Sequence, residues 1–435
     1  MTKTSIHWQE LRRRIDQKAK SEPTQRFWGV FTHSTKLTTL YEAYRQAKKN
    51  GGAPGIDGQS FAEGEQAGVS AFLDSIRAEL LAGTYQPQPH RQGDIPKANG
   101  NMRTLQIPSI RDRVVQGALT RIREAIFEAD FCPHSYGFRP KRSPHQALAG
   151  VRRSLLRRMT TVIDGDLSRT FDTIRHHVLR EKIAKRVQDP QVLHRVKQVI
   201  QGAGKVGGPQ GGPFSPLAAN LYRNEVDGAF EAIRRKTAEG HDEAVHDHRF
   251  ADAMVITVSG HARQRGWADL ALQRLQEYLE PLGVELNREK TRTVNVLKGE
   301  AFSFLGVDFR RVPNRRRTGY FILMTPKQKA RQAIKARIRD VVQNGGAKPA
   351  QDIVTPVNAI LAGWVNYFRV GHSSRAFGEI RDDTAMKIRT LLTRRKRRQK
   401  RSIGWRRGSH EYRYGVLGLY WDWKVHPLKS ADGYR

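Results

Sequence analysis

The sequence predicts a mixed core of helices and strands, of the α/β or α+β class, followed by a separate helical unit. Three observations support this prediction. Helical and strand-like patterns alternate from Ala62 to about Val312. The strand-like patterns stop after about Thr325. Roughly the last hundred residues then consist mainly of strongly basic helical stretches, so the chain changes character towards its C-terminal part.

Individual elements follow from the spacing of apolar residues. In WQELRRRIDQKAK and LTTLYEAYRQAKKN these residues recur every three or four positions, which predicts basic helices within residues 1–50. The density of Gly and Pro in GGAPGIDGQS, residues 51–60, predicts a loop at a domain boundary. Further along, QALAGVRRSLLRRM and HHVLREKIAKRV predict helices, whereas TTVID and RTVNVL predict strands.

The charge of the chain indicates its class of partner. The 435 residues include 77 Lys and Arg against 42 Asp and Glu, a formal net charge of +35. Such an excess requires a polyanion, and nucleic acid is the commonest one in solution. The chain has no apolar run long enough to span a membrane, no apolar leader and a single cysteine, Cys132, so we expect no membrane association and a cytoplasmic location.

Some conspicuous residues have two interpretations. The basic run at residues 394–401 lies near several aromatic rings, which favours contact with nucleic acid over a merely solvated helix face. These rings are Trp364, Tyr367, Phe368 and Trp405. The three in GWVNYF are equally consistent with a buried core. We expect Cys132 to be a small buried hydrophobic residue, and the HDHR segment lacks a further ligand for zinc.

Candidate chemistry lies in carboxylates near strand ends. TTVIDGDLSRTFDTI leads a strand into Asp164, Asp166 and Asp172, and strand alternation places the first two on one face. A second strand-like segment, HRFADAMVITVSG, carries Asp252. If the two strands meet, oxygen ligands without His or Cys favour Mg²⁺, and a pair of such ions is suited to phosphoryl transfer.

Eight motifs appear in an order that resembles one family. They are GGAPGIDG, IPKANGNMRTLQIPSIRDRVVQGAL, SYGFRPKRSPHQAL, DGDLSRTFDTIRH, GGPQGGPFSPLAANLYRNEVD, RFADAMVI, LGVELNREKT and AFSFLGVDF. Together they resemble the successive blocks of bacterial group II intron-encoded reverse transcriptases, and NAILAGWVNYFRVGHSSRAF resembles the maturase, or thumb, domain of that family. The resemblance runs from about Lys49 to Trp421.

This resemblance implies an α+β right-hand polymerase, with fingers and palm, followed by a helical maturase/thumb domain. The expected domains are a basic N-terminal extension over residues 1–50, fingers and palm over 51–312, and the maturase/thumb over 325–421 with a basic C-terminal segment. The implied partners are group II intron RNA and an RNA template with a DNA primer or target DNA. The implied cofactors are two Mg²⁺ ions, with a dNTP as substrate.

The resemblance also assigns roles to single residues. Asp166 and Asp252 match the catalytic, metal-binding carboxylates. The other matching positions surround the incoming nucleotide: Lys97 and Arg103 match cations that grip the triphosphate, Phe171 matches the aromatic gate under the sugar, and Gln210 matches the residue beside the nucleotide. The FLG motif, residues 304–306, matches the hairpin that holds the primer end.

One departure from the family pattern lies at the second carboxylate. The chain reads Phe-Ala-Asp-Ala where the family usually has Tyr-Ala-Asp-Asp, so Ala253 replaces an acid beside Asp252. Thr170 and His177 also depart from the residues more usual there. Changes to groups that merely support metal ligands cost about 10- to 100-fold, so we expect the loss of this acid to impair polymerisation at least that much.

Three interpretations of function therefore remain open. The chain is an RNA-directed DNA polymerase that also supports splicing and retrohoming, with polymerisation impaired by Ala253. Alternatively, it is a fully active reverse transcriptase, or a non-enzymatic RNA-binding maturase. Recruitment of such a protein to another cellular role is a further possibility. An appended DNA endonuclease domain is not expected, because such domains carry paired Cys and His, and no cysteine follows Cys132.

Overall fold

The structure is a computed structural model that describes residues 3–96, 102–168, 173–202, 207–208, 211–239, 244–260, 266–287, 289, 291–345, 348–396 and 409–426. At residues 3–8, 103, 168, 239 and 394–396 it describes the backbone alone. Within this part of the chain, no helix has both the length and the apolar character needed to cross a membrane.

The chain divides into two compact units, which are described separately. The first unit comprises Met1–Arg142, Gly165–Met254 and Asp269–Thr291. The second comprises Ser143–Asp164, Val255–Ala268 and Arg292–Arg435. Strands β3 (Thr161–Ser168) and β5 (Ala253–Val258) each run from one unit into the other.

The first unit begins with five helices among its described residues, of which the first and the third match the two predicted basic helices. They are α1 (Lys3–Ser21), α2 (Val30–Ser34), α3 (Leu37–Asn50), α4 (Phe61–Gln66) and α5 (Val69–Ala82). The predicted loop at residues 51–60 is confirmed. A capping box starts α4, where the Ser60 side chain accepts from the Glu63 amide and the Glu63 carboxylate accepts from the Ser60 amide. Helix α3 packs on α6 (Ile110–Phe127), a largely buried helix.

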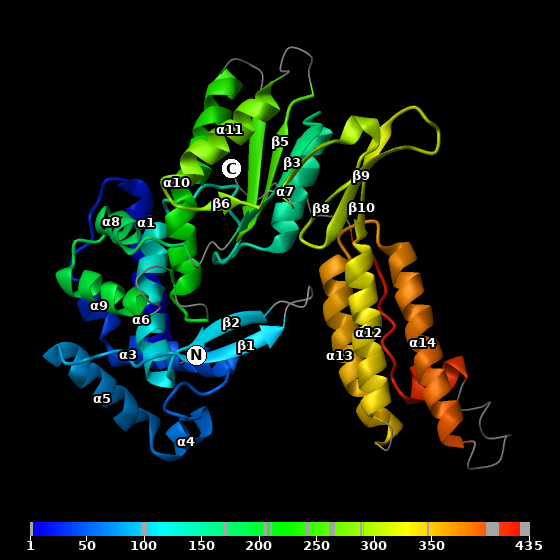
Figure 1. Cartoon of the computed structure of the whole chain (residues 1–435). Coiled ribbons are helices and arrows are strands. Elements are labelled where there is room, and N and C mark those ends of the chain that lie inside the picture. Colours follow the sequence, from blue (N-terminus) through cyan, green and yellow to red (C-terminus); the bar gives the residue numbers. More distant parts are fainter. Residues whose placement is uncertain are drawn as a thin grey trace. The chain divides into compact units, whose positions relative to one another are not determined.

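Between these helices, β1 (Arg91–Pro96) and β2 (Met102–Ile107) pair as an antiparallel hairpin. The remaining helices of this unit are α8 (His176–Ala184), α9 (Pro190–Gln201), α10 (Ser215–Glu239) and α11 (Trp267–Leu279), whose first two residues belong to the second unit. Helix α10, labelled in Figure 1, packs against β4 (Val245–Phe250), most of whose residues are buried.

The main sheet has five strands in the order β4-β5-β3-β6, with β7 also paired to β3. Strands β6 (Glu285–Leu286) and β7 (Arg292–Asn295) pair antiparallel with different parts of β3, β6 at Leu167 and Ser168 and β7 at residues 161–164. The strand predicted for RTVNVL is therefore confirmed for its first four residues, and η2 (Val296–Lys298) follows as a 3₁₀ turn.

The second unit contains helix α7 (Pro144–Leu156) and a smaller sheet. This sheet has the order β10-β9-β8, with β8 (Phe302–Phe304), β9 (Val307–Pro313) and β10 (Tyr320–Pro326) all antiparallel. The turn between β8 and β9 contains Leu305 and Gly306, both with positive φ. The carbonyl of Leu305 accepts a hydrogen bond from the Tyr367 hydroxyl at 2.9 Å, which fixes this turn against a helix.

The strands end at Pro326, one residue beyond the predicted limit, and helices follow. Helices α12 (Gln328–Asn344), α13 (Ala350–Phe368) and α14 (Ser374–Lys396) run side by side, and η3 (Tyr412–Val416) packs beside them (Figure 1). Their shared core includes Ile338, Val357, Leu361 and Ile380. Phe368 is buried, while Trp364 and Tyr367 are partly buried against other rings, so the GWVNYF aromatics form part of the core. The predicted α+β fold followed by a helical region is confirmed.

Candidate active site

Asp252 lies in the tight turn that joins β4 to β5. Only Ala251 and Asp252 separate the two strands, and Ala251 adopts a left-handed φ of 57°. This conformation is unfavourable for a residue with a Cβ and persists where the surroundings enforce it. The turn leaves the Asp252 side chain exposed while Ala251 is buried. The carboxylate is therefore presented to solvent from a constrained backbone.

Contacts beneath the turn enforce its shape. The segment before Gly137 runs alongside β4: the Tyr136 amide donates to the Arg249 carbonyl at 2.8 Å. Gly137 itself lies directly under Ala251, and a methyl group at Gly137 would overlap the Ala251 amide. The Asn220 side chain of α10 holds the Gly137 carbonyl with a 2.8 Å hydrogen bond. Glycine is needed at residue 137 because two backbone segments meet there.

Two fully buried arginines complete the support. Arg223 of α10 donates to the Ala251 carbonyl at 2.7 Å, and Arg249 of β4 donates to the same oxygen at 3.3 Å. Arg249 also forms a two-pronged ion pair with Asp227, with 2.7 and 2.5 Å hydrogen bonds. These charge-assisted contacts hold the turn from inside the protein.

Burial and neighbouring charges shift the pKa values of these two arginines in opposite directions. Burial lowers the pKa of Arg223 to about 9, and the neighbouring charge of Arg249 acts in the same direction. Burial also lowers the pKa of Arg249, but the Asp227 carboxylate outweighs that effect and the net shift is upward. Both guanidinium groups are therefore positively charged at neutral pH, close beneath the Asp252 backbone.

Asp166 is brought to the same place by β3. The amide of Leu167, the next residue, donates to the Asp252 carbonyl at 3.2 Å, so the two aspartates lie on neighbouring chain segments. On the other side of β3, the Asn287 amide donates to the Asp166 carbonyl at 2.9 Å. The Asp166 side chain is partly buried. The structure thus places the backbone segments that carry these two aspartates side by side, although the residues are far apart in the chain.

The donor set at this place suits a hard divalent cation. Asp166 and Asp252 offer carboxylate oxygens, which Mg²⁺ prefers, whereas Ala253 at the start of β5 has only a methyl group. Across the described part of the chain, no group of three or more His, Cys, Asp or Glu side chains has the arrangement of a metal site. A cation here would have two protein carboxylates, with other ligands from water or a substrate phosphate.

Several residues predicted for this site lie elsewhere or outside the described residues. Lys97, Phe171 and Gln210 are outside them, as are Thr170, Asp172 and Trp405. The backbone of Arg103 is in β2, opposite Ile95 of β1, but its side chain is not described. Asp164 accepts a 3.4 Å hydrogen bond from Arg292. His177 is exposed on α8, and residues 304–306 form the β8–β9 turn of the second unit.

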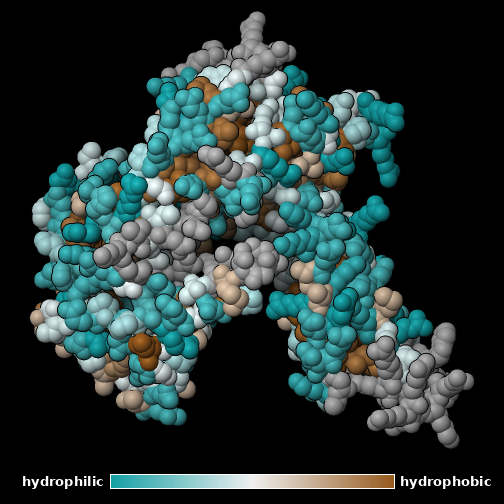
Figure 2. All heavy atoms as spheres, in the orientation of Figure 1, coloured by the Kyte–Doolittle hydropathy of each residue, from teal (hydrophilic) through white to brown (hydrophobic). Residues whose placement is uncertain are grey.

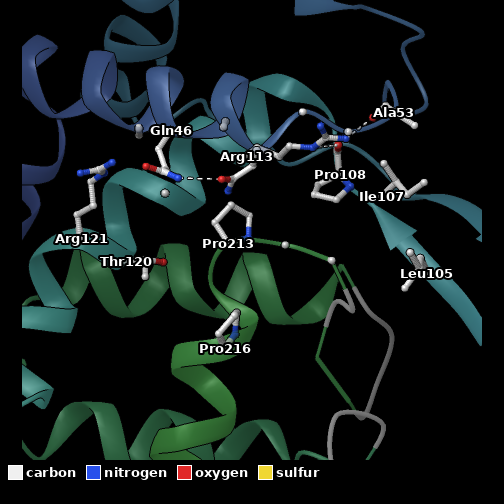
Figure 3. A pocket seen from close by; sticks show the side chains of 18 of the residues that line it. Gln46, Ala53, Leu105, Ile107, Pro108, Arg113, Thr120, Arg121, Pro213 and Pro216 are labelled. Carbon is white, nitrogen blue, oxygen red and sulfur yellow. Dashed lines mark hydrogen bonds between the residues drawn. The ribbon is translucent and has the colours of Figure 1, made fainter. Parts of the chain in front are cut away.

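The glycines after Gln210 pack tightly against the protein. A Cβ at Gly211 would be 3.1 Å from the Gln106 carbonyl, and one at Gly212 would overlap the Gln116 side chain. These glycines also line a cavity of about 800 Å³ between α3, α6 and the β1–β2 hairpin. Figure 3 shows Pro213 and Pro216 on one side of this cavity and Gln46, Arg113 and Arg121 on the other. Gly211 and Gly212 thus lie close to β2 and α6, respectively.

Sequence reasoning missed the residues that support the turn. Gly137, Asn220, Arg223 and Arg249 come from three separate segments, and only their contacts reveal a shared role. The Gly within SYGFRP was the one available signal, since a glycine between large residues often marks a close approach. The predicted interpretation of Cys132 is partly confirmed: the residue is only partly buried, and burial raises the pKa of its thiol to about 12.

Along the chain, the β1–β2 hairpin, the paired strands β3 and β5 and the basic helices after Pro326 follow one another in the order expected of a reverse transcriptase. Residues 95–309 match the family described as reverse transcriptase (RNA-dependent DNA polymerase). Residues 331–410 match the group II intron, maturase-specific domain. The chain belongs to the group II intron-encoded reverse transcriptase/maturase family.

Individual relatives agree with this assignment. Protein YkfC of Escherichia coli is 34% identical over 363 residues, covering 74% of this chain and 93% of that protein. Group II intron-encoded protein LtrA of Lactococcus lactis is 31% identical over 227 residues, 49% of this chain and 37% of LtrA. A 91 kDa protein in the cob intron of Schizosaccharomyces pombe is 24% identical, over 77% of this chain and 50% of that protein. The chain therefore spans less than two thirds of LtrA and of the cob intron protein.

Proposed function

We propose that this chain is an RNA-directed DNA polymerase whose divalent-metal centre is formed by Asp166 and Asp252, and that it also binds group II intron RNA to assist splicing and retrohoming. The observation that carries the proposal is the 3.2 Å hydrogen bond from Leu167 to Asp252, which places the two carboxylate-bearing segments side by side. Reverse transcriptases in general use divalent metal ions; Mg²⁺ and dNTPs are the proposed ion and substrate here.

Each proposed residue has a defined task in this scheme. Asp166 and Asp252 hold the metal, which on binding supplies positive charge to the attacking and leaving oxygens. The contacts beneath the turn hold the Asp252 backbone in position. Lys97 and Arg103 are proposed to bind the triphosphate, Phe171 to pack under the sugar, and Gln210 to lie beside the nucleotide. An RNA template with a DNA primer or target DNA completes the substrate.

Ala253 is proposed to weaken this polymerase. An acid beside Asp252 would add negative charge to a centre that otherwise has two carboxylates, and so would strengthen the binding of dications. Residues that only support metal ligands are worth about 10- to 100-fold in metal affinity or activity. We therefore expect slow extension and a raised metal requirement in the unchanged chain.

The test compares Ala253→Asp with the unchanged chain in primer extension on an RNA template, over a range of Mg²⁺ concentrations. We expect Ala253→Asp to increase the rate at least about 10-fold at low Mg²⁺. Ala253→Asn is the matched control. Asparagine is nearly equal in size to aspartate but neutral, so this variant should extend little faster than the unchanged chain. Asp252→Asn should remove extension in both backgrounds. Equal rates for Ala253→Asp and the unchanged chain would contradict the impairment and favour a fully active enzyme.

A second candidate function is a maturase that binds RNA without polymerising. The match of residues 331–410 to the maturase-specific domain favours it. Exposed Lys329, Arg337 and Arg339 on α12 offer charge for RNA, and Figure 2 shows mainly hydrophilic residues on the visible face of the C-terminal helices. Splicing assistance that survives Asp252→Asn, with no extension by Ala253→Asp, would establish this second function alone.

Under either function, the proposed domains are the N-terminal extension at residues 1–50, the fingers and palm at 51–312 and the maturase/thumb at 325–421.

A further inference from the structure

A second candidate binding site lies within the second unit, beyond the C-terminal end of α7. It is a cavity of about 420 Å³ between this helix end, η2 and the β9–β10 hairpin. Its lining includes Leu156, Arg158, Thr160, Leu297, Arg311 and Tyr320. None of these residues belongs to the carboxylate site, and the family resemblance assigned a role to none of them.

Arg158 occupies a position where helices prefer glycine. The Arg158 amide donates to the Leu155 carbonyl and the Met159 amide donates to the Ser154 carbonyl, which is the Schellman arrangement at a helix end. Arg158 has the left-handed φ of 65° that this arrangement requires. The side chain is exposed and has no carboxylate partner among the described residues. An arginine held in an unfavourable conformation at a cavity edge indicates a use for its charge.

An aromatic ring and a second arginine form another wall. The Arg311 guanidinium lies over the Tyr320 ring, 3.7 Å from its centre. The register pairs Arg311 with Ile322, so Arg311, Tyr320 and Ile322 share one face of the hairpin. Ile322 is buried, but Tyr320 is 60% exposed. This face of the hairpin is therefore buried at Ile322 and exposed at the cation–π pair of Arg311 and Tyr320.

One residue that lines the cavity has a polar group without a partner among the described residues. Thr160 is only 4% exposed, and its hydroxyl has no hydrogen-bond partner among the described residues. Buried hydroxyls normally have a partner, so this one is available to a ligand. Beside it, Leu156 and Leu297 are 52% and 50% exposed, which provides apolar walls. Cations, a ring, apolar walls and one hydroxyl together match the parts of a nucleotide.

We propose that this cavity binds one nucleotide of single-stranded RNA. The base lies against the Arg311–Tyr320 pair and the leucine walls, Arg158 contacts the adjoining phosphate, and the Thr160 hydroxyl donates to or accepts from the base edge. Arg158 and Arg311 supply positive charge at the cavity itself, which favours a polyanionic strand over an uncharged small molecule. The proposal rests on the RNA binding of the proposed function and adds a site separate from its carboxylates.

The experiment uses the full chain and a fluorescein-labelled single-stranded 12-nucleotide RNA that contains 4-thiouridine. Affinity is measured by anisotropy across a salt series, and contact is located by cross-linking and mass spectrometry. Arg158→Gly should lower the slope of log affinity against log salt by about 0.7, the value for one phosphate contact on a single strand. Its melting temperature should equal or exceed that of the unchanged chain, because glycine favours this backbone conformation.

Matched variants separate this site from general charge. Arg317→Gly is the control, since Arg317 is also an exposed arginine with left-handed φ, 54°, but lies outside the cavity. It should leave the cross-link to the Tyr320 peptide unchanged, whereas Arg158→Gly should weaken it. Tyr320→Ala should reduce affinity about 5-fold or more, and Tyr320→Phe should retain it.

The outcomes distinguish this site from the proposed function. The unchanged chain could bind the RNA while Arg158→Gly and Arg317→Gly give the same salt slope and the same cross-link. This result would contradict the proposed cavity site and leave the proposed function standing. Cross-links that form only on peptides without Arg158, Arg311 or Tyr320 would place the strand elsewhere and overturn the proposal. If the unchanged chain fails to bind RNA at all, both proposals fail.

Discussion

Arginine serves opposite purposes in two regions of this molecule. Beneath the Asp252 turn, Arg223 and Arg249 are fully buried and bind backbone carbonyls and a carboxylate. On α12, Arg337 and Arg339 are exposed to solvent. The first pair determines the shape of a turn, and the second pair contributes to an electrostatic surface. The net charge of +35 is therefore not a measure of the surface that nucleic acid meets.

The difference follows from the surroundings of the guanidinium. Inside the protein the group must satisfy its donors and balance its charge, because an unpaired buried charge is strongly unfavourable. Arg249 does so with Asp227, Asn220 and Ser135. On the surface, water and salt screen the group, so its loss changes long-range attraction more than folding. The two regions can be compared with one kind of substitution.

The largest effect is expected for Arg249→Gln. This change leaves the Asp227 carboxylate buried without its partner and removes a donor from the Ala251 carbonyl. Breaking a buried ion pair from one side costs about 3–5 kcal/mol. Urea unfolding monitored by circular dichroism should show this loss. A loss below about 1 kcal/mol would contradict the structural role assigned to the buried arginine.

Sequence patterns predicted the parts of the fold that depend on local spacing. The amphipathic repeats located α1, α3 and α7, and the β-branched run located β3. Asp166 and Asp252 were found because each follows or begins a strand, a feature that is visible within ten residues of sequence. Their proximity, however, depended on the family resemblance and not on local spacing.

The supports of the site could not be predicted because they are contacts between distant segments. Arg223 reaches Ala251 across 28 residues, and Ser135 reaches Arg249 across 114. An arginine in a helix such as α10 is usually solvated, so its burial depends on which segments pack over it. Likewise, Gly137 could not be linked to the turn until the backbone of Ala251 was seen beside it.

The next effect concerns Gly137→Ala, which tests the turn from below. The added methyl group would overlap the Ala251 amide, so the hairpin must shift or the segment must move away. Overpacking of this kind costs about 1–3 kcal/mol. Thermal unfolding should show a lowered melting temperature. Gly228→Ala on α10, where a methyl group would have open space, is the control and should not destabilise the protein.

A third prediction uses Asp247, a buried residue between the two histidines of HDHR. Burial raises its pKa to about 8, and the Asp227 charge acts in the same direction. Between about pH 4 and 8 the folded protein keeps a proton that the unfolded chain releases, so this group lowers stability as pH rises. Burial lowers the pKa of His134 to about 4, which has the opposite effect up to its ordinary value of 6.5.

Below pH 6.5 the effects of Asp247 and His134 on stability offset each other. Above pH 6.5 only the effect of Asp247 remains of these two. Between pH 6.5 and 8 the protein should therefore lose up to about 1.4 kcal/mol per pH unit through this group. Asp247→Asn cannot titrate and should flatten the profile in that window. Urea midpoints measured at pH 6.5, 7.25 and 8 compare the two chains, and parallel profiles would show that Asp247 does not hold the extra proton.

The smallest change in stability is expected for Arg339→Gln, the surface counterpart of Arg249→Gln. Arg339 is exposed on α12 and forms no ion pair within the described residues, and glutamine has nearly the same helix propensity. Its unfolding free energy should stay within about 0.5 kcal/mol of the unchanged chain. If α12 binds RNA, the salt slope of RNA affinity should nevertheless fall by about 0.7. An Arg339→Gln chain with a clearly lower unfolding free energy and unchanged RNA affinity would contradict this contrast. The exposed arginine would then stabilise the fold as the buried arginines do.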